Sequence, residues 1–280
     1  MRTRNPTLND EIFDREATRV ATSLRQSGTY IPPAPDAVSQ WPPPGITRPP
    51  AVGYEPMTVN GTMTAAGVLL AILLAAAIFG WTTVDPLPDG TGVEVPGWLL
   101  FAVFGGLGVA VLTVFKPAWA RVTGPIYAVI EGLLVGAISH LYDIAFDGIV
   151  LQAIGLTIGV FALMLFLYAS RIIKVTDKLR LGIVAATGAV FLVYMFDIVL
   201  RLFGAEVPFI HSNGVIGIII SLVIVGIAAM NLVLDFDFVE RGVARRAPKH
   251  MEWYAAFGLL VTLIWLYLEL LRLLGKLRSR

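Results

Sequence analysis

The amino-acid sequence predicts an all-α membrane protein with seven transmembrane helices. The first reason is composition: 56% of the 280 residues are hydrophobic and 15% are charged, whereas about 25% charged residues is usual in soluble domains. The mean hydropathy is +0.76. The second reason is a series of seven long apolar runs, and the third is a regular alternation of basic and acidic connections between them.

The last apolar run, Trp253 to Leu274, is the clearest of the seven. Its roughly 22 residues, at about 1.5 Å each, cross a hydrocarbon core of about 30 Å. The other six runs are also long enough to span a bilayer, allowing for tilt. We place the seven spans at residues 63–83, 97–115, 124–142, 148–168, 181–203, 214–234 and 253–274.

Residues 1–60 form a polar extension before the membrane domain at 61–280. Five apolar residues near helical spacing predict a short amphipathic helix, namely Leu8, Ile12, Phe13, Val20 and Leu24. A solvated helix is the simpler interpretation, and a membrane-surface or partner-binding helix is the alternative. Nine of the 17 prolines lie between Ile31 and Pro56, which predicts an extended, semi-rigid linker. No signal-peptide pattern is evident.

The connections predict the orientation. The second, fourth and sixth connections are rich in Lys and Arg, whereas the first and third carry Asp or Glu and no basic residue. The positive-inside rule therefore places the N-terminus in the cytoplasm of a multi-pass protein of the plasma membrane. Seven spans then place the C-terminus outside. The basic tail, with Lys276, Arg278 and Arg280, disagrees, and the alternative is a last span that does not fully cross.

Several function classes find no support in the sequence. The chain contains no cysteine, which excludes disulfides and Cys-ligated metals, and its three histidines are far apart. It has no recognisable nucleophile or nucleotide-binding motif. A net charge of +1 is no nucleic-acid signal. We therefore expect no enzyme, no resident cofactor and no nucleic-acid partner, and the expected surroundings are the lipid bilayer.

Acidic residues inside the spans are the functional candidates, because a charge in the membrane is costly and faces an interior or a partner. Glu131 in span three, and Asp235 and Asp237 at the end of span six, are predicted to meet in one cytoplasmic-side cluster that senses cations or pH. Glu131 is the best single candidate for a buried carboxylate, because it has no cationic neighbour in its own helix. The two aspartates have an equally good structural interpretation as the polar end of span six.

A second set of charges lies near the outer ends of two spans. Asp197 and Arg201 are four residues apart in span five, and Glu269 and Arg272 are three apart in span seven. Intrahelical ion pairs are the favoured interpretation, and an outer functional cluster is the alternative. Two Gly-x-x-x-Gly pairs, Gly132–Gly136 and Gly155–Gly159, predict close helix packing.

Four segments carry a resemblance to an actinobacterial-looking branch of the Bax inhibitor-1 family, the transmembrane Bax-inhibitor-motif proteins. They are PIYAVIEGLLVGAIS (125–139), TDKLR with the following AATGAVF (176–191), LDFDFVERG (234–242) and LYLELLRLLGKL (266–277). The resemblance covers residues 60–280 and leaves the proline-rich extension outside. It implies two three-helix layers around a central C-terminal helix. For some members it implies a pH-gated calcium leak, with a gate formed by two hydrogen-bonded aspartates.

The first aspartate of that gate corresponds to Asp235 or Asp237, and the second departs from the family pattern. Local similarity assigns its place to Glu269, whereas counting back from Arg272 and Gly275 assigns it to Thr262. Depth favours Thr262, because Glu269 lies roughly 24 Å along span seven. The two-aspartate sensor is therefore not expected to be intact. Our hypothesis is that Glu131 supplies the second acid.

The leading functional prediction is a pH-responsive cation leak, with calcium passing transiently over carboxylate and carbonyl oxygens. The alternative is a non-conducting membrane regulator that binds a membrane-protein partner in quality control or stress. A continuous polar path through the bundle favours conduction, and a sealed apolar core favours the regulator. The sequence leaves the ion, the direction of pH gating, any metal site and the oligomeric state open.

Overall fold

The structure is a computed structural model that describes residues 15–16, 18–19, 22–23, 26, 55–86, 93–94, 96–202 and 214–279. Within these residues, seven helices are long and apolar enough to cross a membrane, which confirms the predicted spans. The helices are α2 (Val59–Trp81), α3 (Trp98–Phe115), α4 (Ala120–Ala145), α5 (Ile149–Ala169), α6 (Asp177–Leu202), α8 (Val215–Ala244) and α9 (Met251–Arg278). A single 3-10 turn (Pro117–Trp119) precedes α4, and two-residue strands β1 (Asp85–Pro86) and β2 (Val93–Glu94) pair antiparallel between α2 and α3.

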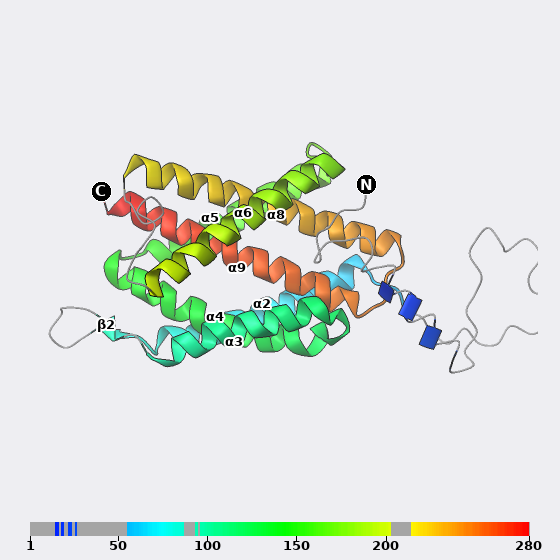
Figure 1. The fold of residues 1–280 in the computed structure, drawn as a ribbon, viewed down its shortest axis with the longest axis horizontal. Coiled ribbons are helices and arrows are strands. Elements are labelled where there is room, and N and C mark those ends of the chain that lie inside the picture. Colours follow the sequence, from blue (N-terminus) through cyan, green and yellow to red (C-terminus); the bar gives the residue numbers. More distant parts are fainter. Residues whose placement is uncertain are drawn as a thin grey trace, which may run out of the picture.

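The C-terminal helix α9 lies at the centre of the bundle (Figure 1). On one side α2 and α3 pack on α4, and on the other α5 and α6 pack on α8, so the predicted two three-helix layers are confirmed. Hydrophobic clusters flank both sides of α9: Leu266 belongs to the one shared with α8, and Leu260 to the one shared with α2 and α4. We call the end of the bundle where α9 begins the near end, and the end where α9 finishes the far end.

The α2–α4 contact is the tightest helix packing of the described bundle. A Cβ on Gly132 or Gly136 would overlap with the backbone carbonyl oxygen of Leu73 or Ala77 in α2. Glycine is needed here because only a hydrogen atom fits between the two backbones. The prediction of close packing is confirmed for this pair. It is wrong for Gly155 and Gly159, where a Cβ would meet nothing within 4 Å.

Helix α8 is longer than expected. The sequence predicted that Asp235 and Asp237 close this span, but the helix continues to Ala244. The reason is that the apolar side chains between and after the acids, Phe236, Phe238 and Val239, are buried in the cluster shared with α9. Both aspartates therefore lie inside a packed helix and not at its polar end.

The chain before α2 is attached to the near end of the bundle. The Met57 N–H donates to the Ala247 carbonyl at 2.7 Å. The backbone N–H and hydroxyl of Thr58 donate to Glu252 Oε1 at 2.9 and 2.8 Å. The five residues that predicted an amphipathic helix, and the proline-rich linker up to residue 54, lie outside the described residues, although those described between 15 and 26 are helical.

Candidate functional site around the central helix

Asp235 is the acid of α8 that faces α9. Its side chain is buried, with 8% exposure for the residue. The Thr262 side chain lies within hydrogen-bonding reach of the Asp235 carboxylate, and the Thr262 hydroxyl donates to the Gly258 carbonyl at 3.2 Å. Within the described residues, Asp235 Oδ2 has no hydrogen-bond partner. Counting back from Arg272 and Gly275 in the sequence had assigned the second gate position to Thr262, and Thr262 is the residue of α9 that lies beside Asp235.

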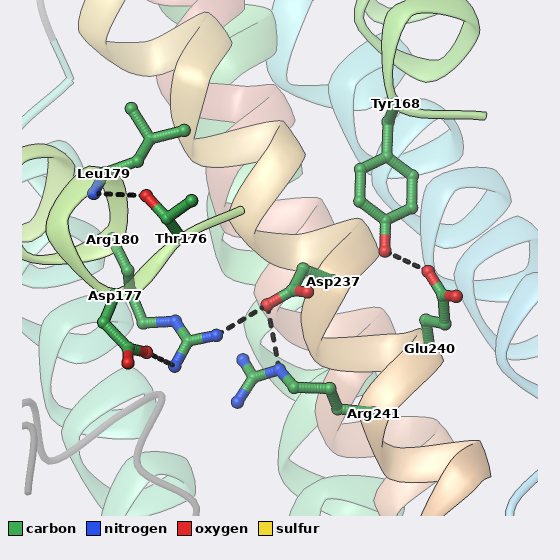
Figure 2. Close-up of polar contacts among 8 residues, drawn as sticks. All are labelled: Tyr168, Thr176, Asp177, Leu179, Arg180, Asp237, Glu240 and Arg241. Atoms are coloured by element: carbon green, nitrogen blue, oxygen red, sulfur yellow. Dashed lines mark hydrogen bonds and ion pairs between the residues drawn. The ribbon is translucent and has the colours of Figure 1, made fainter. Parts of the chain in front are cut away.

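Asp237, two residues later, points to another side of α8 and is paired. Its Oδ2 accepts from Arg180 of α6 at 2.9 Å and from Arg241 at 2.8 Å (Figure 2). Since two guanidinium groups compensate this carboxylate, Asp237 ties α6 to α8. Of the two aspartates that the sequence left open, only Asp235 meets α9.

Glu240 makes the equivalent link between α8 and α5. Its carboxylate accepts from the Tyr168 hydroxyl (Figure 2) and from Arg171 at 2.6 Å. Arg171 lies just beyond α5 and has a positive φ of 57°. The neighbouring Glu240 raises the pKa of Arg171, so this guanidinium stays charged at every relevant pH. The acids at the near end of α8 thus divide into two that are paired with arginines, Asp237 and Glu240, and one, Asp235, for which the described residues show no cationic partner.

Glu131 occupies a different environment. It lies eleven residues into α4, roughly 16 Å from the start of the helix. Its Oε1 is 2.7 Å from the position that a Cβ on Gly106 of α3 would take, and Tyr127 is its side-chain hydrogen-bond neighbour. Among the described residues no three Asp, Glu or His side chains form a metal-holding group. The predicted cluster of Glu131, Asp235 and Asp237 is therefore wrong, because each acid packs against a different helix.

At the far end, the predicted pair of Glu269 and Arg272 is confirmed at 3.2 Å. Glu269 is 2% exposed, so the acid of the pair is buried in the bundle, whereas Arg272 is partly exposed. Tyr194 of α6 completes the arrangement: its hydroxyl donates to Glu269 at 2.7 Å, accepts from Arg272, and its ring lies under the Arg272 guanidinium at 5.0 Å. Sequence reasoning missed Tyr194, because a tyrosine in an apolar helix carries no signal of its own.

The other far-end residues have mixed outcomes. Asp197 is buried, but the side chain of Arg201 lies outside the described residues, so their predicted pair stays a prediction. Lys276, which the sequence placed in a basic tail, is 6% exposed and donates to the Gly217 carbonyl at 3.1 Å and to Ser221 at 2.9 Å. Arg278 donates to the carbonyl of Asp147 in the α4–α5 connection at 2.6 Å. Of the three basic residues near the C-terminus, Lys276 and Arg278 therefore form hydrogen bonds with other parts of the bundle.

Charged residues also hold the N-terminal chain to the near end. Lys249 forms an ion pair with Glu55 and lowers the pKa of that carboxyl. Glu16 Oε2 lies 3.3 Å from His250 Nε2. Burial lowers the pKa of His250, although the Glu16 carboxylate favours its charged form. These contacts lie beside Glu252, which receives the hydrogen bonds of Thr58.

A model of the Bax inhibitor 1-like family matches residues 5–279 of the chain. The match reaches almost to the first residue, so the expectation that the proline-rich extension lies outside the resemblance is wrong. A comparison with curated proteins finds no match.

Proposed function

Because the chain belongs to the Bax inhibitor 1-like family, we propose that this integral membrane protein is a pH-responsive leak for cations, calcium in particular. The observation that supports the proposal best is the buried carboxylate of Asp235, which faces the central helix and has one oxygen without a hydrogen-bond partner in the described part of the chain. A carboxylate in such a place changes charge by one unit when it gains or loses a proton. In this proposal, the packing of α8 on α9 changes when Asp235 gains or loses its proton.

The sensor that we propose has one acid. A shared proton between two carboxylates requires both within a few Å, and the position opposite Asp235 is Thr262. Thr262 supplies a hydroxyl, which hydrogen-bonds to a charged or a neutral carboxyl group but carries no charge itself. Asp235 alone therefore carries the pH response in this proposal, and Glu131, which contacts α3, does not.

The proposed orientation is an N-terminus in the cytoplasm of the plasma membrane. It is supported by basic residues at the near end, with Arg171 and Lys174 before α6, Lys178 in the first turn of α6, and Arg245 and Arg246 after α8. The far-end cations that disagreed, Lys276 and Arg278, bind bundle carbonyls, so they are poor indicators of side. Asp235 then lies toward the cytoplasmic half.

The test is calcium flux into liposomes that carry the purified protein, measured from about pH 6 to 8. Wild type is expected to give flux that varies with pH, and Asp235→Asn is expected to remove the variation, because the amide does not titrate. Glu131→Gln is the matched control, an equally conservative change of a buried acid on another helix, and should keep the variation. No flux above empty liposomes at any pH would reject the proposal and favour a non-conducting regulator with a protein partner.

A further inference from the structure

We infer that the cation route follows the interface of α6, α8 and α9, and that the hydrogen-bonded group of Tyr194, Glu269 and Arg272 closes its far end. We call this interface the seam, and the inference rests on the proposed function. The seam is the part of the described bundle where polar side chains connect helices at successive depths from one end to the other.

Polar residues recur every seven positions on two of the three helices. On α6 these are Arg180, Thr187 and Tyr194, and on α9 they are Thr262, Glu269 and Lys276. Seven residues make almost two helical turns and rise about 10.5 Å, so each set lies on one face of its helix. Antiparallel α8 supplies the partners from Asp237 and Asp235 down to Ser221.

Each depth of the seam has a polar contact between two of its helices. Arg180 bonds to Asp237 at 2.9 Å at the near end, followed by the Asp235–Thr262 contact. In the middle, Asn231 Nδ2 donates to Thr187 Oγ1 at 2.8 Å. Toward the far end come Tyr194 on Glu269 at 2.7 Å and Lys276 on Ser221 at 2.9 Å. When α6 moves, the side-chain oxygens that now accept these hydrogen bonds can bind a hydrated cation instead.

The opposite side of α9 is less suited to opening. There α2 and α4 pack so closely that Gly132 and Gly136 allow no larger side chain. The helix α6, by contrast, exposes most of its apolar side chains and packs chiefly on α8. Its polar side chains Arg180, Thr187 and Tyr194 bond to α8 and α9. The seam therefore has the more mobile wall and the polar lining.

Two layers close the seam in this structure. The first is apolar: Leu266 of α9 and Ala228 of α8 are fully buried between the Thr187 level and the Glu269 level. The second is the far-end group, in which the Tyr194 hydroxyl contacts both Glu269 and Arg272 from another helix. Moving α6 away from α9 must break both contacts.

The first experiment measures whether water reaches the seam. The chain has no cysteine, so Thr187→Cys places a single thiol at mid-depth in the seam. Ala189→Cys, on the exposed face of the same helix, is the matched control. A cationic, membrane-impermeant methanethiosulfonate reagent reacts with the thiolate form of cysteine. Because a thiolate forms where water reaches the side chain, modification reports access of water. In flux-active liposomes we expect it to modify Thr187→Cys and to leave Ala189→Cys unmodified.

The outcomes separate the route from the function. Calcium flux by the protein without modification of Thr187→Cys, or with equal modification of both variants, would overturn the seam as the route and leave the leak intact. Absence of flux in the wild type would overturn both. Modification of Thr187→Cys that blocks flux would support the route.

The second experiment tests the far-end closure. Tyr194→Phe removes the hydroxyl that contacts Glu269 and Arg272 but keeps their ion pair and the ring. Hydrogen bonds to charged groups of this kind correspond to about a tenfold shift in an equilibrium, so flux should rise about tenfold and keep its pH dependence. Tyr267→Phe is the control, because that hydroxyl bonds to Ser139 of α4 at 2.6 Å, outside the seam. Equal flux in the two variants would overturn the closure.

Discussion

The tight contact between α2 and α4 gives the sharpest prediction about the fold. Gly136→Ala adds one methyl group at a position where it would overlap with the Ala77 backbone carbonyl. A backbone oxygen cannot rotate away as a side chain can, so the two helices must separate. Gly155→Ala adds the same methyl group to α5, where nothing lies within 4 Å.

The size of the effect follows from these surroundings. Inserting a methyl group into a filled interior costs about 1–3 kcal/mol, which corresponds to a fall of about 2–12 °C in Tm at about 2–4 °C per kcal/mol. The control has no such cost, and alanine is favoured over glycine in a helix by up to about 1 kcal/mol. Gly155→Ala should therefore unfold at the wild-type temperature or slightly above it.

The assay is thermal unfolding of the purified full chain in detergent, followed by tryptophan fluorescence, with wild type, Gly136→Ala and Gly155→Ala in parallel. If Gly136→Ala unfolds no earlier than Gly155→Ala, then the two backbones do not approach as closely as the structure has them. The account of α2 and α4 as the rigid side of the bundle would fail with it.

Two further predictions concern the attachment of the chain before α2. Glu252→Gln weakens two hydrogen bonds from Thr58 to a buried carboxylate, so limited proteolysis of the intact protein should cleave before α2 several times faster than in wild type. Glu55→Gln removes only an exposed ion pair with Lys249 and should leave Tm unchanged. Since Lys249 lowers the pKa of Glu55, that pair is complete above the ordinary Glu range and is lost only as pH falls through the lowered pKa. Calcium flux between pH 6 and 8 should therefore be the same with and without it.

The sequence predicted the fold well because hydropathy determines which segments span, and the charged connections mark where they end. It failed at the end of α8, where the two aspartates looked like a boundary. The buried Phe236, Phe238 and Val239 show why: a helix continues through charges when apolar residues beyond them still pack on a neighbour. The Gly-x-x-x-Gly pattern correctly predicted close helix packing at Gly132 and Gly136 and wrongly predicted it at Gly155 and Gly159. The pattern marks a face that allows close approach, but it does not show whether another helix packs on that face.

The candidate site was only partly predictable. Counting residues placed Thr262 opposite the acid of α8, because a fixed spacing along one helix is encoded in the sequence. The hypothesis that joined Glu131 to Asp235 failed, because it required knowing which helices face each other across α9. Thr187 and Tyr194 were missed, although their seven-residue spacing from Arg180 was visible. A threonine or tyrosine in an apolar run becomes informative only when its partner on another helix is known.

The two sides of α9 suggest why a chain that lacks a second acid can still respond to pH. On the α2–α4 side, close backbone packing leaves little freedom, so a change of charge at Asp235 cannot be relieved there. On the α6–α8 side, the contacts between helices include hydrogen bonds whose partners can be exchanged for water. A change of charge at Asp235 would then be accommodated on the side of the seam, where α8 and α6 move relative to a fixed α9. A pH response of this kind requires one titrating carboxylate and one helix interface that can move, and it requires no second acid.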